Sequence, residues 1–354
     1  MSRYDYDREG LASLFSDLPR YRIEQIRRAF LTRFAEPAEV HEVPASLRRR
    51  LAESPELAAS FEVARDVHTD DGATRKWLLR LNDGALIETV LMHHERHSTV
   101  CVSSQAGCAM ACTFCATGDA GFTRHLSRGE IVEQVALAGR AARAGGRRLD
   151  HVVFMGMGEP LANFTNVESA TLCIVDEIGL ASRHVTISTV GVVPGIKRLT
   201  GFDRQVNLAV SLHAANDELR NTLVPLNRRY PIARLVEACK EYVEATHRRI
   251  SLEWALIDGV NDSPTEAREL VPIARELRAH VNLIPLNPTE GGLSRGLRGS
   301  PVARVRRFRD TLVAANVNVT LRRSRGREIS AACGQLAGAA TADNDPIGLR
   351  ARAG

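Results

Sequence analysis

Short runs of apolar, β-branched residues alternate with longer helical patterns from Thr99 to about residue 315. The runs have the length of buried strands, and the stretches between them repeat apolar positions every three to four residues, as amphipathic helices do. Strands that alternate with helices predict parallel β/α units. Eight units do not fit this length, so we predict an α/β fold with a partial (β/α)6 barrel. The predicted strands are TVCVSS, HVVFMG, HVTISTV, NLAVSLHA, ISLEWALI and HVNLIPLN.

The chain before this series follows other patterns. Leu11, Leu14 and Leu18 repeat at helical spacing, and no strand-like alternation is evident near them. The turn residues Asp83 and Gly84 stand between two apolar runs, which predicts a β-hairpin. The predicted parts are a small helical N-terminal domain (1–75), a β-hairpin extension (76–98), the barrel (99–336) and a disordered tail (337–354).

The composition is that of a soluble globular protein, with 354 residues of which 44% are hydrophobic and 25% charged. The start, MSRYDYDREG, lacks the apolar segment of a secretory signal, and no stretch approaches the roughly 18 to 20 apolar residues that span a bilayer. Seven cysteines, three of them crowded together, suit metal ligation in a reducing compartment better than a disulfide framework. We therefore expect a cytoplasmic protein with no membrane partner, and we take it to be a monomer.

Positive charge is concentrated in one segment. Between Arg295 and Glu328 the chain has ten arginines and two acidic residues, a local charge of +8 beside a net charge of +5 for the whole chain. This concentration indicates a phosphate-binding surface. A solvated helix face on an arginine-rich protein is the alternative interpretation.

Three cysteines directly follow the first predicted strand of the barrel. Cys108, Cys112 and Cys115 occur in GCAMACTFCATG with the spacing CxxxCxxC. Three thiolates on one short loop can ligate three irons of a four-iron cluster and leave the fourth iron open for a cofactor. A zinc site would need a fourth ligand from elsewhere. The candidates for that ligand are His93, His94 and His97. The spacing differs from the paired CxxC ligands of most zinc sites and closely resembles the cluster loop of the radical S-adenosylmethionine (SAM) superfamily.

Small and polar residues follow several predicted strands, which is where parallel β/α folds carry their chemistry. The motif GMGEP at 156–160 lacks the third glycine of a dinucleotide fingerprint, because Leu161 takes that place, so we reject dinucleotide binding. The motif resembles instead the radical SAM element whose backbone meets the SAM amino group. The candidate SAM-binding residues are Gly158, Glu159, Ser188, Ser211, Leu212, His213 and Asn287.

Longer strings extend the likeness along most of the chain. They are, in order, TVCVSSQAGCAMACTFCATG, VFMGMGEPLAN, SLHA, DGVNDSP, VNLIPLNP and RRSRGREISAACGQL. Together they resemble the RlmN/Cfr family of radical SAM RNA methyltransferases over about residues 20–336. The resemblance implies a radical SAM barrel, a 4Fe-4S cluster, SAM and an electron donor such as flavodoxin or ferredoxin. It implies methylation of adenosine in 23S ribosomal RNA and in transfer RNA, at C2 in the RlmN branch, which the cluster loop resembles more, and at C8 in Cfr.

The resemblance also implies roles for residues outside the cluster loop. Cys333 takes a methyl group from one SAM molecule, and a radical made from a second SAM removes hydrogen from that methyl group. After the carbon adds to adenine, Cys101 attacks the Cys333 sulfur, and a transient Cys101–Cys333 disulfide forms as methylated RNA leaves. Glu88 matches the family's proton acceptor, which removes the original C2 proton. The arginine-rich segment and the N-terminal domain would contact RNA phosphates.

Three further residues and several alternatives complete the interpretation. Cys173 and Cys239 lie on apolar helical faces, and we assign both to packing. Ala111 stands where the family commonly has glycine, and we expect it to be tolerated if the backbone there avoids positive φ. Methylation at C8, a different radical SAM reaction and a non-catalytic iron–sulfur or zinc RNA-binding protein stay open as alternatives.

Overall fold

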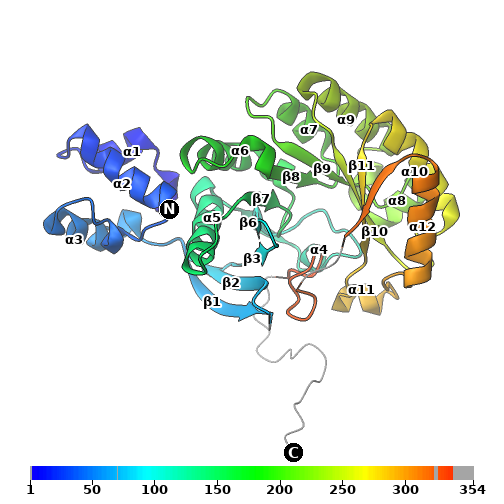
Figure 1. Cartoon of the computed structure of the whole chain (residues 1–354), viewed down its shortest axis with the longest axis horizontal. Helices are drawn as coiled ribbons and strands as arrows, with labels where there is room; N and C mark the ends of the chain where they lie inside the picture. Colours follow the sequence, from blue (N-terminus) through cyan, green and yellow to red (C-terminus); the bar gives the residue numbers. More distant parts are fainter. Residues whose placement is uncertain (1, 70, 323–325, 338–354) are drawn as a thin grey trace, which may run out of the picture.

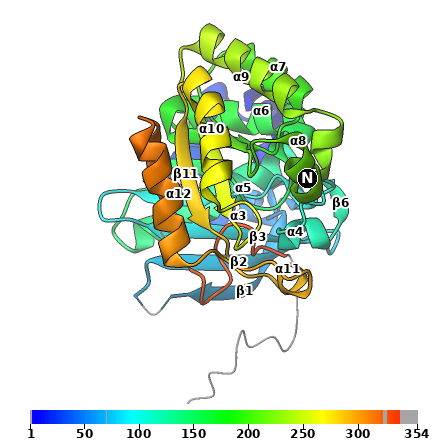
Figure 2. The same ribbon diagram turned by 90° about the vertical axis from the view of Figure 1, so that its right-hand side faces the viewer.

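The six predicted barrel strands form the centre of the protein in a computed structural model that describes residues 2–69, 71–322 and 326–337. They lie side by side in chain order, and each pairs in parallel with the next. Helices cover the outer face of this curved sheet (Figures 1 and 2). The predicted partial barrel is therefore confirmed. Its strands are β4 (Ser98–Cys101), β7 (His151–Phe154), β8 (Val185–Thr189), β9 (Asn207–Ser211), β10 (Ser251–Leu256) and β11 (His280–Pro285).

The helices between these strands begin at recognisable caps. Ser127 and Glu130 form a capping box at the start of α5, and Ser263 and Glu266 form another at the start of α10. The helices of the barrel are α5 (Arg128–Ala144), α6 (Phe164–Leu172), α7 (Val193–Thr200), α8 (Asp217–Leu223), α9 (Ile232–Thr246), α10 (Pro264–Glu276) and α12 (Val302–Ala314). Shorter elements are β5 (Gln105–Gly107), α4 (Ala116–Asp119), β6 (Phe122–His125), η4 (Pro160–Asn163), η5 (Cys173–Glu177), η6 (Ser182–His184), η7 (Pro225–Arg228) and α11 (Glu290–Ser294). No helix within the described ranges is long and apolar enough to cross a membrane.

The sheet is longer than the sequence pattern predicts at both ends. Beyond β11 a further parallel strand, β12 (Asn318–Leu321), forms one edge, and it was missed because it is short and half exposed. At the other end, β2 (Thr74–Leu81) and β3 (Leu86–His93) make the predicted hairpin, and β3 pairs antiparallel with β4. The expectation that residues 1–75 are helical is wrong at its end, because β1 (Phe61–His68) pairs with β2. Most of β1 is exposed on both faces of the sheet edge, so its sequence carries no buried, alternating pattern.

The N-terminal helices pack on the outside of the barrel against α5 (Figure 1). Asp5 Oδ1 accepts a hydrogen bond from Gly129 N–H (2.6 Å) at the start of α5, and Ser2 Oγ donates to Glu133 Oε2 (2.7 Å) one turn later. Polar contacts to buried groups thus fix this unit to the barrel. Its elements are η1 (Arg3–Asp5), α1 (Arg8–Leu14), α2 (Arg20–Thr32), η2 (Pro37–Glu39), α3 (Ala45–Glu53) and η3 (Pro55–Leu57).

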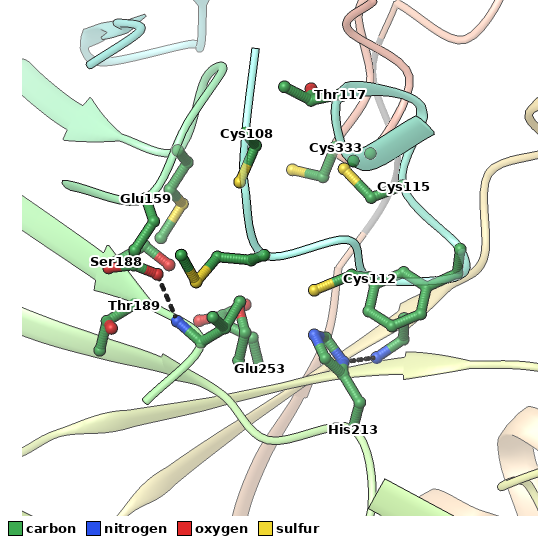
Figure 3. A pocket seen from close by; sticks show the side chains of 18 of the residues that line it. Cys108, Cys112, Cys115, Thr117, Glu159, Ser188, Thr189, His213, Glu253 and Cys333 are labelled. Atoms are coloured by element: carbon green, nitrogen blue, oxygen red, sulfur yellow. Dashed lines mark hydrogen bonds between the residues drawn. The ribbon is translucent and has the colours of Figure 1, made fainter. Parts of the chain in front are cut away.

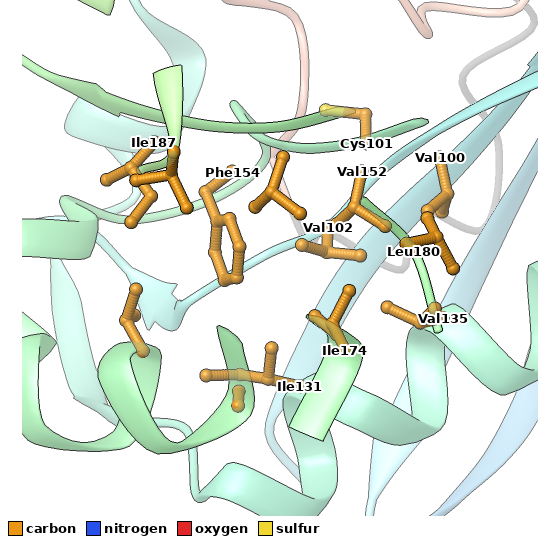
Figure 4. Packing of buried hydrophobic residues seen from close by; sticks show 14 of the residues in the cluster. Val100, Cys101, Val102, Ile131, Val135, Val152, Phe154, Ile174, Leu180 and Ile187 are labelled. Atoms are coloured by element: carbon orange, nitrogen blue, oxygen red, sulfur yellow. The ribbon is translucent and has the colours of Figure 1, made fainter. Parts of the chain in front are cut away.

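The main core lies between the first barrel strands and helices α5 and α6 (Figure 4). Val100 and Val152 come from adjacent strands, and Ile131 and Val135 from α5; all four side chains are fully buried. Cys173 and Cys239 are likewise buried at 1% exposure, which confirms their assignment to packing. The predicted disordered tail lies, from residue 338 on, outside the described residues.

Candidate active site

The predicted cluster loop connects β5 and β6, which form a separate two-stranded sheet. Backbone bonds anchor the loop at two points along its course, from Cys108 N–H to Gly121 O (2.6 Å) and from Thr113 N–H to Leu223 O (3.1 Å). Arg295, from the predicted basic segment, donates through Nε to Thr113 O (2.9 Å). The loop is therefore held by the barrel rather than by its own turn alone.

Ala111 in this loop has a strained backbone. Its φ is 52°, in the left-handed region where Cβ approaches the following carbonyl group. The expectation of tolerance depended on a backbone that avoids positive φ, and that condition is not met. The loop keeps a backbone suited to glycine, and alanine there carries a strain of about 1 to 2 kcal/mol.

Loops that follow the barrel strands line a cavity that is open on one side (Figure 3), at the end of the strands where parallel β/α folds bind their ligands. The cluster loop contributes one wall, and the C-terminal segment around Cys333 contributes another. The predicted site residues that line the cavity are Cys108, Cys112, Cys115, Gly158, Glu159, Ser188, Ser211, His213, Asn287 and Cys333. Three predicted site residues, Leu212, Cys101 and Glu88, do not belong to its lining.

The three cluster cysteines lie where a thiolate is unfavourable unless a cation is bound beside it. Burial raises the pKa of Cys108 to about 12 and that of Cys112 well above its usual value. Thiolate ligands at these positions therefore require a bound metal, whose charge deprotonates a coordinating thiol. Within the described ranges, no three His, Cys, Asp or Glu side chains are placed to hold a single metal ion. Three thiols along a loop around a cavity suit a cluster of several irons.

The histidines of the zinc alternative lie away from the cavity. His94 and His97 stack on each other with ring centroids 4.4 Å apart, and His97 meets His151 edge to face at 4.8 Å. His93 lies at the end of β3 and its Nδ1 is 2.8 Å from Ser98 Oγ. None of the three candidates lines the cavity among the described residues, so they are not placed to give a fourth ligand.

Glu159 ties two strand ends together instead of pointing freely into solvent. Its Oε1 accepts from Leu161 N–H (3.0 Å), and its Oε2 accepts from Val190 N–H (2.8 Å) after β8. Its own N–H donates to Gln105 Oε1 (2.8 Å). Burial raises the pKa of Glu159 to about 7. The carboxylate thus sets the backbone of the GMGEP motif at the cavity wall.

His213 is held as a neutral ring at the end of β9. Its Nδ1 accepts a hydrogen bond from Ala255 N–H (3.0 Å), and its ring meets Phe114 edge to face at 4.7 Å. Burial lowers the pKa of His213 to about 3. Its φ of 60° turns the chain sharply after Ser211. Leu212 is buried, and its N–H donates to Glu253 O (3.1 Å), so its side chain belongs to the core.

The C-terminal segment brings Cys333 to the cavity. Asn287 Nδ2 donates to Cys333 O (3.1 Å), and the Cys333 side chain is exposed to the cavity (Figure 3). Cys101 lies at the end of β4, buried at 7% exposure. Burial raises the pKa of Cys101 to about 12, the nearby Cys333 thiol adds to this rise, and Arg322 opposes it. The two thiols and Arg322 are therefore within electrostatic reach of one another.

Three charged side chains of the site, all from later parts of the chain, were not among the predicted site residues. Arg220 is buried at 1% exposure and donates to Leu212 O (2.9 Å) and Val190 O (2.7 Å), which fixes the loops after β8 and β9. Glu253 and Arg322 both line the cavity. Glu253 stands inside the otherwise apolar strand β10, and a charge within a strand buried on both sides was the available signal for an inward-facing residue.

Two buried oxygens of residues that line the cavity, Glu253 Oε2 and Asn287 Oδ1, have no hydrogen-bond partner among the residues that the structure describes. Buried acceptors are nearly always satisfied in folded proteins, so these two await donors from a bound molecule. SAM carries hydroxyl and amino donors, and the surrounding cavity is mostly apolar, as a nucleoside requires. The residues present therefore fit both a thiolate-bound cluster and SAM.

The predicted basic segment is divided by the fold. Arg295 binds the cluster loop and Arg322 faces the cavity, whereas Arg304, on α12, pairs with Asp258 (3.1 Å). Exposed arginines of this region also lie along α12, on the outer layer of the barrel (Figure 2). Arg323 and Arg325 lie outside the described residues.

Comparison with known proteins agrees with this geometry. The family model of the radical SAM superfamily matches residues 102–271. A protein of Salinispora tropica named "Probable dual-specificity RNA methyltransferase RlmN" is 49% identical over 347 residues, which cover 95% of this chain and 92% of that protein. A protein of the same name from Corynebacterium diphtheriae is 46% identical, with 90% of this chain and 88% of that protein covered. The chain belongs to the RlmN family of radical SAM methyltransferases.

A solved structure supports this membership. The crystal structure of a radical SAM methyltransferase from Sphaerobacter thermophilus matches with a TM-score of 0.91 and 46% sequence identity, and it covers 96% of this chain and all of that one. As a family member the protein is an enzyme that uses a 4Fe-4S cluster and SAM. The cavity between the cluster loop and Cys333 is where both would be held.

Proposed function

We propose that the protein methylates C2 of adenosine in 23S ribosomal RNA and in transfer RNA, with Cys333 as methyl carrier. The observation that carries this proposal is the presence of Cys333 and the cluster loop in one cavity, although they lie far apart in the chain. The relatives are named dual-specificity RNA methyltransferases, which supports RNA as the substrate class.

The proposed mechanism assigns the two distant cysteines successive roles. When bound, the cluster and SAM supply a methyl group and, with one electron from a flavodoxin or ferredoxin, a 5′-deoxyadenosyl radical. Cys333 accepts the methyl group on sulfur and presents it to the cavity, where one hydrogen atom is abstracted and the carbon bonds to adenine C2. The adduct would give one electron back to the cluster and its original C2 proton to a base. Cys101 then attacks the Cys333 sulfur, and a Cys101–Cys333 disulfide forms. The electron pair of the broken sulfur–carbon bond stays on the carbon, which takes up a proton and becomes the methyl group.

The chain supports the order of these roles. Cys333 is exposed to the cavity and can react with a bulky cofactor, whereas Cys101 is buried and its thiol pKa is raised to about 12. A buried, protonated thiol is a poor nucleophile, so Cys101 does not compete with Cys333 for the methyl group. Arg322 opposes the rise in the pKa of Cys101, and it thereby favours the Cys101 thiolate that the later attack requires.

Glu88 is our candidate for the base that removes the C2 proton, on the strength of the family match alone. Exposed arginines of α12 and the outward surface of the N-terminal helices are the surfaces we assign to RNA phosphates. The proposed enzyme acts as a monomer in the cytoplasm.

The test is mass mapping of ribosomal and transfer RNA after anaerobic reaction of the cluster-loaded enzyme with SAM and a reductant. We expect 2-methyladenosine from the wild type and none from Cys333→Ala. We expect Cys101→Ala to accumulate RNA bound covalently to Cys333, visible as a shifted band on a denaturing gel. Cys173→Ala, which changes a core cysteine, is the matched control and should retain activity.

Each contrary outcome has a definite reading. Full methylation by Cys333→Ala would refute the carrier mechanism, and 8-methyladenosine would place the enzyme with Cfr. SAM cleavage without RNA modification would indicate a different radical SAM reaction. Failure to cleave SAM, with RNA still bound, would indicate a non-catalytic RNA-binding protein.

A further inference from the structure

The antiparallel strands that precede the barrel carry a buried ion pair. Lys76 Nζ lies 2.6 Å from Glu88 Oε1, and the two side chains are only 13% and 7% exposed. In the strand register, Lys76 stands opposite Val90 and Val90 opposite Cys101. Residues opposite one another, and residues two apart on a strand, share a face of the sheet. Lys76 and Glu88 therefore lie on the same face as Cys101.

The C-terminal segment that carries Cys333 runs along this face. We call residues 330–337 the carrier strap. Lys76 Nζ donates to Ser330 O (3.2 Å) at its first residue, and Glu88 Oε2 accepts from Ala337 N–H (2.7 Å) at its last. One ion pair thus contacts both ends of the carrier strap.

The middle of the carrier strap is bound to the cavity wall. Ala116 N–H donates to Gly334 O (2.8 Å), and Thr117 Oγ1 donates to Leu336 O (2.5 Å), both from the helix that follows the cluster cysteines. Figure 1 shows this orange-red segment beside α4 and α11. The carrier strap accordingly bridges the cluster loop and the hairpin of β2 and β3.

We propose that Lys76 and Glu88 are positioning residues, a two-ended clamp that holds the carrier strap so that the Cys333 sulfur faces the bound cofactor. The inference rests on the proposed role of Cys333 as methyl carrier. It gives Glu88 a task that precedes any contact with RNA, in addition to the proton transfer proposed above. A displacement of about 1 Å at a reacting atom slows a reaction by about a hundredfold, so a loosened carrier strap should slow the uptake of methyl by Cys333.

The test separates the clamp from base catalysis by a half-reaction that contains no RNA. Cluster-loaded wild type, Lys76→Met and Glu88→Gln are incubated with SAM, and methyl on Cys333 is followed by peptide mass spectrometry. Amide hydrogen exchange of residues 330–337 is measured in parallel. We expect both variants to take up methyl about tenfold more slowly or worse, and the amides of the carrier strap to exchange at least about tenfold faster.

Two further variants serve as controls. Lys76→Arg keeps a cation that can donate to both Glu88 and Ser330 O, and it should recover most of the slow exchange and the methyl uptake. Arg80→Met removes an exposed ion pair with Glu62 from the same strand and should behave as the wild type. The absorbance of the cluster checks that each variant is folded and loaded.

The outcomes are distinct. The clamp would be overturned if Lys76→Met and Glu88→Gln both showed the exchange and the methyl uptake of the wild type. If RNA methylation were then lost only in Glu88→Gln, Glu88 would be left as a base. If wild-type Cys333 never receives methyl, the carrier function fails, yet faster exchange in both variants still supports the structural clamp. If a variant loses its cluster, amide exchange of residues 330–337 is compared between that variant and wild type that also lacks the cluster. Faster exchange in the variant then supports the clamp, and equal exchange overturns it.

Discussion

Gly158 offers a sharp test of how the cofactor wall is built. Its φ is 96°, and a Cβ at this position would lie 2.5 Å from Gln105 Cβ and 2.7 Å from Gln105 Cγ. Gly158→Ala therefore combines backbone strain, about 1 to 2 kcal/mol, with crowding, which adds about 1 to 3 kcal/mol. The crowded Gln105 also accepts the hydrogen bond of Glu159 N–H, so the shift spreads into the GMGEP motif.

The matched control for this change is Gly179→Ala. Gly179 has a similar φ of 86°, but a Cβ there would meet no described atom within 4 Å, so Gly179→Ala introduces the strain without the crowding. In urea unfolding, we expect Gly158→Ala to lose about 1 to 3 kcal/mol more stability than Gly179→Ala. SAM binding, measured by calorimetry, should be lost only in Gly158→Ala. Equal destabilisation of the two variants, with SAM binding intact in both, would refute the argument that this wall leaves no room for a side chain.

Two smaller predictions concern His213 and Ala111. Because burial lowers the pKa of His213 from 6.5 to about 3, its contribution to stability is complete above pH 6.5 and is lost as the pH falls, by about 2 kcal/mol at pH 5. His213→Asn can adopt the same φ and accept the same hydrogen bond, but its side chain does not titrate. In urea unfolding, its loss of stability between pH 7 and pH 5 should therefore be smaller than that of the wild type. An unchanged loss would contradict a neutral buried ring. Ala111→Gly should stabilise the protein by about 0.5 to 1 kcal/mol. Ala120→Gly, at φ −70° in the same loop, is the control and should destabilise it. A loss of stability in both variants would show that Ala111 is unstrained.

The sequence predicts the barrel well because every residue of its six strands is buried or half-buried. Runs such as HVVFMG have no polar face, and their alternation with amphipathic helices allows few other folds. Strand β1 fails this test because it lies at an exposed edge, where its charged residues face solvent. Local sequence is enough to predict the barrel strands, whereas β1 becomes a strand only because it pairs with β2.

Some residues of the site can likewise be predicted from local sequence, and others cannot. The cluster cysteines are close in sequence, so their spacing alone indicates the chemistry. Glu253 and Arg322 act through the cavity that distant segments build, and no spacing connects them. The Lys76–Glu88 pair falls between these cases, because the turn at Gly84 sets the register of the hairpin, yet only the tertiary structure shows that the carrier strap lies on that face.

The incomplete barrel gives the carrier strap its place. In the described part of the chain the sheet ends at β12 on one side and, beyond β3 and β2, at β1 on the other, and these two end strands do not pair. After β12 the chain reaches Gly326, which packs so closely against Thr74 of β2 that a Cβ would lie 2.9 Å from Thr74 Cγ2. The carrier strap follows a few residues later and contacts Lys76 of β2 and Glu88 of β3. A closed eightfold barrel would pair those ends through strands, whereas the open one leaves room for a segment that brings Cys333 to the cluster loop and to the face that holds Cys101.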